Sequence, residues 1–206
     1  MKFILGTKQY QTELFHDDGT VTPATVLSAG PLVVTQVKKN ETDGYAAVQV
    51  GFIPAKSSRI TRAQQGHVKK SGGMFRVLRE FRVPEDVANT FTVGSTIDVS
   101  AFEKGDKVAV SGTTKGKGFQ GAVKRHGFSG GPRSHGQKHS EREVGSIGAG
   151  GMQRVIKGMR MPGRMGNNRV TVKNLKVLEK DASKQLLVIS GAVPGRRGAL
   201  IEVRSI

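Results

Sequence analysis

Short runs rich in β-branched and aromatic residues recur along most of the chain, and polar or glycine-containing turns separate them. Runs of this kind are typical of β-strands. They span residues 2–5, 24–29, 32–37, 45–52, 75–83, 107–111, 170–178, 186–190 and 199–203. Asp17-Asp18-Gly19-Thr20 and Lys180-Asp181-Ala182-Ser183 are polar turn signals between such runs. The spacing predicts a mainly β fold, either an antiparallel barrel or a sandwich.

Only one stretch has the composition of a short helix. It runs from Ser58 to Lys69, and Ser58 is its candidate N-cap. The sequence therefore predicts an all-β body with little helix.

Between Lys115 and Val170 the strand pattern disappears. These 56 residues hold 12 Lys and Arg, two acids (Glu141 and Glu143) and 14 of the 28 glycines, with no apolar periodicity. Such a segment cannot bury enough apolar surface to order itself. A disordered linker is the alternative, but linkers are seldom this basic. We expect residues 1–114 and 170–206 to form one β-barrel body, with 115–169 as an extended basic loop inserted between two of its strands.

The charge of the whole chain narrows the class of partner. Lys and Arg number 33 against 16 Asp and Glu, which gives a formal net charge of +17 and a pI near 10.5. A field this strong favours a polyanion. Membrane surfaces are also anionic, but the chain has no apolar run of about 18 residues and no basic amphipathic helix. Nucleic acid is therefore the expected partner, and no membrane is expected.

The residues that are missing exclude several kinds of site. There is no cysteine, which excludes disulfides, thiolate metal sites and cysteine nucleophiles. The first residues, 1–7, lack the apolar length of a secretory signal and the Arg/Ser-rich character of an organelle presequence. We expect a cytoplasmic protein.

The basic segment mixes cations, glycines and aromatic residues in a way that suits folded RNA. Lys115-Gly116-Lys117-Gly118-Phe119-Gln120-Gly121 is followed by Lys124-Arg125-His126-Gly127-Phe128. Glycines let the backbone approach phosphates, cations neutralise them, and Arg, His and Phe stack on unpaired bases. The predicted RNA-contacting residues are Lys115, Lys117, Lys124, Arg125, His126, Arg133, His135, Lys138, His139, Arg142, Arg154, Lys157, Arg160, Arg164 and Arg169.

Four methionines lie near or among the cations in the second half of the segment, at Met152, Met159, Met161 and Met165. In a regular helix they would form a small core stripe. The glycines and the proline between them, within 158–166, argue against a helix, so flexible packing against RNA is the competing interpretation.

Two enzyme-like patterns occur in the same segment. Residues 116–121 match G-x-G-x-x-G, with Glu141 about twenty residues further on. A dinucleotide site needs a helix and a parallel βαβ unit after the glycines, and 126–132 does not predict one. Residues 112–118 resemble a P-loop, but the spacing is one residue short and Gly118 replaces the Ser or Thr that binds magnesium.

Metal and catalytic sites have no positive support in the sequence. His135 and His139 are four residues apart, but no cysteine or helical context accompanies them. No nucleophile elbow is present. We expect no cofactor, no metal, no catalytic residue and no small-molecule substrate. An enzyme that binds a nucleotide and an architectural DNA-binding protein stay as alternatives.

Taken together, these motifs resemble the bacterial form of the universal large-subunit ribosomal protein three family over nearly the whole chain. The most specific matches are 115–125, 145–148, 157–166 and 191–195. Weaker ones are 17–19, 34–38 and 43–49.

The resemblance implies a six-stranded barrel of the translation-protein type, with the inserted loop reaching toward the peptidyl-transferase centre. It also implies direct binding of large-subunit rRNA, an early role in subunit assembly and contacts with neighbouring ribosomal proteins. Two departures from the family pattern are present. Gly6-Thr7-Lys8 is followed by Gln9 rather than by Gly-Met-Thr, and Ala149-Gly150-Gly151-Met152 stands where some members carry a methylated glutamine, so that modification is not carried over to Gln153.

Overall fold

The structure is a computed structural model that describes all residues from Met1 to Ile206. The chain divides into two compact units. Met1–Thr113 together with Arg169–Ile206 form the first unit, called the body below. Thr114–Asn168 form the second, called the extension.

Six antiparallel strands of the body form a closed barrel in the order β1-β12-β7-β10-β11-β2. The ends of the chain close it, because Phe3 of β1 pairs with Arg204 of β12. The strands are β1 (Phe3–Phe15), β2 (Val21–Ala29), β7 (Lys107–Thr113), β10 (Arg169–Asp181), β11 (Leu186–Ser190) and β12 (Leu200–Ser205).

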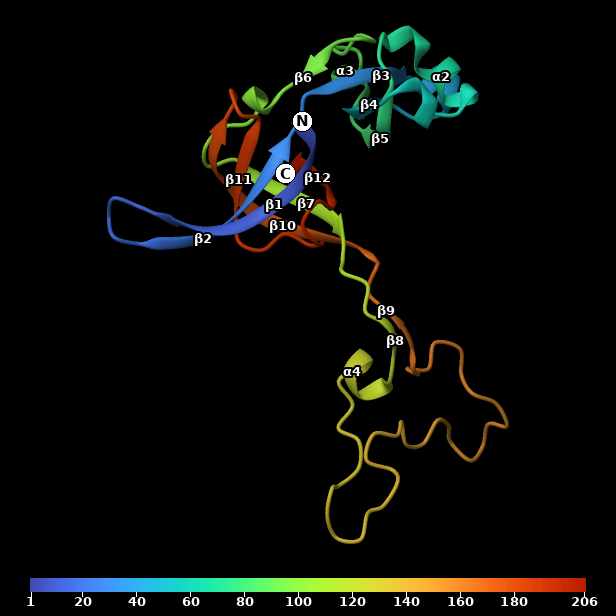
Figure 1. Ribbon diagram of the computed structural model, residues 1–206. Helices are drawn as coiled ribbons and strands as arrows, with labels where there is room; N and C mark the ends of the chain where they lie inside the picture. The colour runs from blue at the N-terminus through green and yellow to red at the C-terminus, as the bar shows by residue number, and fades with distance from the viewer. The chain divides into compact units, whose positions relative to one another are not determined.

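The strands β1 and β2 continue past the barrel as a long hairpin, visible in blue in Figure 1. The predicted polar turn connects them: the Thr20 N–H donates to Asp18 Oδ1 at 2.9 Å, and Gly19 has φ +78°. The far end carries Phe15, which is 75% exposed.

A second sheet of four strands completes the body, in the order β5-β4-β3-β6. Its strands are β3 (Leu32–Lys38), β4 (Ala47–Pro54), β5 (Phe75–Arg82) and β6 (Thr96–Ile97). Each of the nine predicted runs overlaps a strand, and the prediction of a mainly β chain is confirmed. The prediction of one barrel or sandwich for all nine runs was incomplete. Three of the predicted runs pair among themselves, because the chain leaves the barrel at the Gly30–Pro31 turn after β2.

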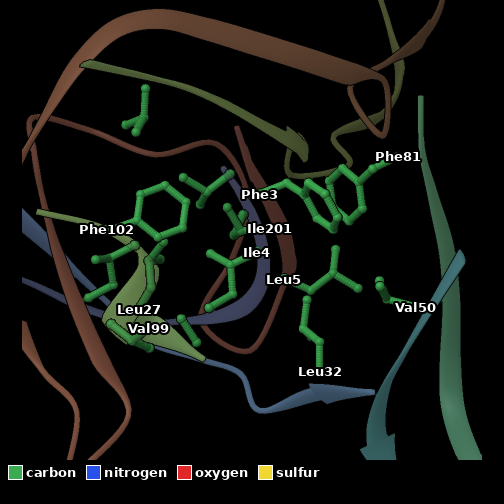
Figure 2. Close-up of a cluster of buried hydrophobic side chains, with 14 of the residues drawn as sticks. Phe3, Ile4, Leu5, Leu27, Leu32, Val50, Phe81, Val99, Phe102 and Ile201 are labelled. Atoms are coloured by element: carbon green, nitrogen blue, oxygen red, sulfur yellow. The ribbon is translucent and has the colours of Figure 1, made fainter. Parts of the chain in front are cut away.

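One hydrophobic core joins the barrel to the second sheet. Figure 2 shows Phe3 and Ile4 of β1 among side chains from both sheets. Phe3 stacks on Phe81 of β5 with ring centroids 4.5 Å apart, and Leu5 and Val50 are fully buried beside them. Apolar positions of two sheets therefore bury one another, which fixes the sheets within a single unit.

The helices of the body are short. They are α1 (Asn40–Asp43), α2 (Arg62–Val68), α3 (Glu85–Ala88) and the 3₁₀ turns Ser57–Arg59, Lys69–Ser71 and Val99–Ala101. No helix of the structure is both long and apolar enough to cross a membrane.

The prediction of one helix from Ser58 with Ser58 as its cap was wrong in detail. Ser58 lies in a separate 3₁₀ turn, and Ile60 has an extended backbone that breaks the run. Helix α2 begins after Thr61, whose Oγ1 accepts a hydrogen bond from the Gln64 N–H at 3.4 Å. The hydroxyl of Thr61, directly before the first residue of α2, therefore caps the helix in place of Ser58.

The extension has little regular structure. It contains β8 (Gly118–Gln120), α4 (Ala122–His126) and β9 (Gly163–Met165), and the remaining residues form turns and irregular chain. Only one of its apolar side chains, Ala122, is buried.

Candidate nucleic-acid interface

The two ends of the extension run side by side as an antiparallel ladder. The Thr114 N–H donates to the Asn168 carbonyl at 3.0 Å, and the Lys117 N–H donates to the Met165 carbonyl at 2.9 Å. Between them, Gly166 has φ +76°, and a Cβ there would lie 2.1 Å from the Lys115 carbonyl oxygen. Only glycine permits this close approach of the two backbones. The ladder therefore holds the backbone of Lys115 and Lys117 in a fixed position.

Helix α4 is tied to the chain just before β9 by two of the predicted RNA-contacting residues. Arg125 Nη1 donates to the Met161 carbonyl at 2.5 Å, and His126 Nε2 lies 3.1 Å from the same oxygen. Gly163 makes room for this contact, because a Cβ there would lie 2.7 Å from Arg125 Nη1. Arg125 and His126 are half-buried, so they organise the extension, and Arg125 also contributes charge.

One aromatic ring of the extension lies beside a cation, and a second is exposed. Arg160 lies over the Phe128 ring, with its guanidinium carbon 4.9 Å from the centroid, and the His126 ring is 5.8 Å from Phe128. These residues line part of a hollow of about 630 Å³. Phe119 is 76% exposed and pairs in register with Arg164. An exposed aromatic ring is suited to stacking on an unpaired base.

The acids of the chain do not neutralise the cations of the extension. All four ion pairs lie in the body: Lys2–Asp106, Lys38–Glu80, Arg79–Glu202 and Arg169–Glu202. The two acids of the extension form none. The positive field of the extension is therefore left for an external anion.

Most predicted RNA-contacting residues are exposed and lie along irregular chain. No hydrogen bond or ion pair holds their side chains in the following set: Arg133, His135, Lys138, His139, Arg142, Arg154 and Lys157. The structure does not gather these seven into one site. Lys115, Lys117, Lys124 and Arg164 are exposed near the ladder and α4.

Arg169 stands apart from the others, because it begins β10 and belongs to the body. Its guanidinium forms an ion pair with Glu202, which also lies 3.5 Å from Arg79 Nε. Its contact with RNA stays a prediction.

The prediction that no helix follows the glycines at 116–121 was wrong. Helix α4 begins directly after Gly121, because Gly163 and the Met161 carbonyl give Arg125 a place to dock. The strand before it, β8, pairs antiparallel with β9. A dinucleotide fold uses a parallel βαβ unit and a longer helix at this point, so this arrangement is of a different kind.

Phe119 and Phe128 were missing from the predicted contact residues, although the motif contained both. Their signal was an aromatic residue in a segment that has no apolar periodicity of the helix or strand kind. Such a residue has no core to enter, and it is a candidate for stacking on a ligand.

Comparison with known proteins identifies the family to which the chain belongs. The family model described as "Ribosomal protein L3" matches residues 67–185. The large ribosomal subunit protein uL3 of Finegoldia magna is 47% identical over 99% of this chain and 97% of its own length. Those of Desulfosudis oleivorans and Prochlorococcus marinus are 48% and 49% identical, over 98% of this chain and 97% and 92% of their own lengths. Similarity of this extent, end to end, shows that the chain belongs to the ribosomal protein L3 family.

Proposed function

We propose that this chain is a structural component of the large ribosomal subunit that binds large-subunit rRNA directly through its extension. The names of its relatives support the ribosomal part of the proposal. The observation that carries the RNA part is the surplus of exposed cations in the extension, none of which is paired with an acid.

The proposed mode of binding has two parts. Exposed Lys and Arg neutralise phosphates and release counterions, which supplies affinity that depends on salt. Phe119 and the pair of Phe128 with Arg160 stack on bases that are not in a duplex. The scarcity of buried apolar groups means that the extension gains much of its order from the RNA.

The family resemblance extends the proposal to the position of the protein in the subunit and to the stage of assembly at which it binds. The extension reaches toward the peptidyl-transferase centre, the protein joins the subunit early in assembly, and the body contacts neighbouring ribosomal proteins. In this role the protein acts by holding RNA in a conformation and performs no chemistry itself. Any effect on peptide-bond formation passes through the RNA.

Sedimentation of a cell lysate tests the ribosomal part. The lysate is run through a sucrose gradient at low and high salt, and the fractions are probed for this protein. We expect co-migration with the large subunit that survives high salt. Presence only in the soluble fractions at the top of the gradient would contradict the proposal.

Competition binding tests the choice of nucleic acid. Purified full-length protein is bound to large-subunit rRNA and challenged with duplex DNA of equal phosphate concentration. Stacking on unpaired bases requires that the rRNA resist displacement. Equal displacement by duplex DNA would favour an architectural DNA-binding protein, and saturable binding of NAD or ATP in titration calorimetry would favour a nucleotide-dependent enzyme.

A further inference from the structure

The net charge of the protein is concentrated in two segments, of which the extension is only one. Residues 56–82 hold eight Lys and Arg and one acid, a surplus of seven. Residues 115–170, which comprise nearly all of the extension and also Arg169 and Val170 of the body, hold twelve Lys and Arg and two acids, a surplus of ten. The other 123 residues hold thirteen of each sign, so these two segments account for the whole net charge of +17. Apart from residues 56–82 and Arg169, the body is electrically balanced.

The single acid of this segment, Glu80 of β5, is held by neighbours within the second sheet. Glu80 accepts hydrogen bonds from Tyr45 OH at 2.9 Å and from Gln49 Nε2 at 3.2 Å, and Lys38 Nζ lies 3.0 Å away. Of the eight cations in the segment, only Arg79 is in an ion pair. The remaining seven are therefore not neutralised by any carboxylate of the chain.

Three of those cations surround one hollow in the body. Its volume is about 560 Å³, within the range of roughly 300–1,000 Å³ that is usual for ligand sites. Lys56, Arg59 and Arg76 line it together with Gln64. The apolar lining comes from Ile53, Pro54, Ala55, Ile60 and Phe75. No acid lines the hollow.

The ring of Phe75 is held in a defined position. A Cβ added at Gly51 would lie 2.3 Å from the ring, and one at Gly73 would lie 2.7 Å from it. Because glycine has no side chain, Gly51 and Gly73 leave the space that the Phe75 ring occupies. Ile53, which lines the hollow, has φ +61°, a rare and strained conformation for a β-branched residue, and strained residues cluster at ligand and active sites.

Hydrogen bonds fix the segment that carries Arg59. The Gln65 side-chain amide donates to the Ser57 carbonyl at 2.8 Å and to the Ile60 carbonyl at 2.9 Å. His67 Nε2 lies 2.8 Å from Gln49 Oε1 in the second sheet. Because an amide oxygen only accepts, His67 donates in this contact and anchors α2 to β4.

We propose that this hollow binds an unpaired nucleotide of large-subunit rRNA, with the base against Phe75 and the phosphate held by Arg59, Arg76 and Lys56. The combination of an apolar ring and several cations matches the two halves of a nucleotide. Gln64 is exposed beside the ring and offers an amide to the edge of the base. The inference rests on the proposed function and adds to it a second contact, located on the body.

Two sets of variants of the full-length protein test the site by filter binding to large-subunit rRNA over a range of salt concentrations. Arg59→Gln with Arg76→Gln should make the slope of log affinity against log salt shallower by about 1.4–1.8, as expected for two lost phosphate contacts. Phe75→Leu should weaken binding roughly 5- to 100-fold at every salt concentration and leave the slope unchanged. The matched control is Arg196→Gln with Arg197→Gln, which removes two exposed arginines from the same body and should change binding little.

Photo-crosslinking gives a second readout that does not depend on folding of a variant. The wild-type protein is irradiated with the rRNA and digested with trypsin. We expect a nucleotide attached to the peptide 71–76, which lies between the cleavage sites at Lys70 and Arg76 and contains Phe75.

The possible outcomes separate this inference from the proposed function. Equal losses in the two arginine pairs, or no crosslink on peptide 71–76, would overturn the nucleotide site while binding through the extension stands. Unchanged rRNA affinity with weaker co-sedimentation in the Arg59 and Arg76 variant would also overturn it, and would assign the hollow to an acidic protein segment. Absence of rRNA binding by the wild-type protein would overturn both.

Discussion

Phe3, in the first strand of the barrel, stacks on Phe81 of the four-stranded sheet, with ring centroids 4.5 Å apart and an angle of 23° between the planes. Phe91 adds a third ring 5.6 Å from Phe3, and the Arg204 guanidinium carbon lies 4.9 Å from the centroid of Phe81. This contact links residues 78 positions apart. It makes the two sheets of the body depend on each other for their stability.

Removing the Phe81 ring should destabilise the whole body. Phe81 is fully buried, and a Phe→Ala change in a core costs about 3–5 kcal/mol. We expect Phe81→Ala to lower the free energy of unfolding by that amount, measured by urea denaturation. Phe15→Ala is the control, because Phe15 is 75% exposed and such changes usually stay within about 0.5 kcal/mol. Similar effects of the two changes would refute a shared core.

The ion pair between Lys38 and Glu80 makes the stability of the four-stranded sheet depend on pH. Burial raises the pKa of Glu80, but the hydrogen bonds from Lys38, Tyr45 and Gln49 outweigh it, so that its pKa lies below the ordinary 4.5. The hydrogen bonds with Tyr45 and Glu80 raise the pKa of Lys38 from 10.5 to about 12. The Glu80 contribution to stability is therefore present above pH 4.5 and lost as the pH falls through its folded-state pKa. That of Lys38 is present below pH 10.5 and lost as the pH rises through about 12.

Glu80→Gln should therefore lower stability at neutral pH by about 1–2 kcal/mol, because hydrogen bonds to a charged acceptor are lost. The difference from the wild type should shrink as the pH is lowered from about 5 to about 3. Urea unfolding at several pH values measures both. Glu41→Gln is the control, since Glu41 is exposed and in no ion pair. A difference that stays constant with pH would show that the charge of Glu80 is not what stabilises the sheet.

Nine of the twelve strands could be predicted from the sequence because each is a local pattern, whereas the short strands β6, β8 and β9 could not. How the strands pair could not be predicted. Residues 32–37 and 186–190 are similar in composition, yet the first enters the four-stranded sheet and the second the barrel. The choice depends on contacts such as Phe3 with Phe81, which join distant positions. Short helices were missed for the same reason, since α4 depends on Met161 and Gly163, more than thirty residues away.

The basic extension could be found from composition alone, whereas the hollow on the body could not. Arg59 and Arg76 are seventeen positions apart, and only the fold places both around Phe75. The charge surplus at 56–82 was nevertheless present in the sequence. The balanced charges of the rest of the body mask this surplus in the composition of the body as a whole.

The Arg125 contact predicts how the extension responds to a single methyl group. Gly163→Ala would place a Cβ 2.7 Å from Arg125 Nη1, so the guanidinium must move, and we expect it to lose its bond to the Met161 carbonyl. Hydrogen bonds to charged groups contribute about 1.5–3 kcal/mol. We expect amide hydrogen exchange in α4 to become roughly 10- to 100-fold faster. Gly121→Ala is the control, because no atom lies within 4 Å of its Cβ position and its φ is −66°. Equal exchange in both variants would show that Arg125 does not hold α4.

The unpaired cations of the extension predict how it responds to RNA. In the isolated protein, trypsin should cut at exposed Lys and Arg within 115–169 before it cuts the body, because few apolar contacts hold this segment. Bound rRNA should protect the same sites, since phosphates occupy the cations and the chain becomes ordered on binding. A variant with Lys117→Gln, Lys124→Gln and Arg164→Gln should lose part of this protection, and its affinity should depend less steeply on salt, by about 2–3 in the logarithmic slope. The charge-matched control replaces three exposed lysines of the body, Lys104, Lys173 and Lys184, with Gln. Equal resistance of 115–169 to trypsin with and without RNA would mean that the extension is ordered by its own contacts, and that the ladder and α4 suffice to hold it.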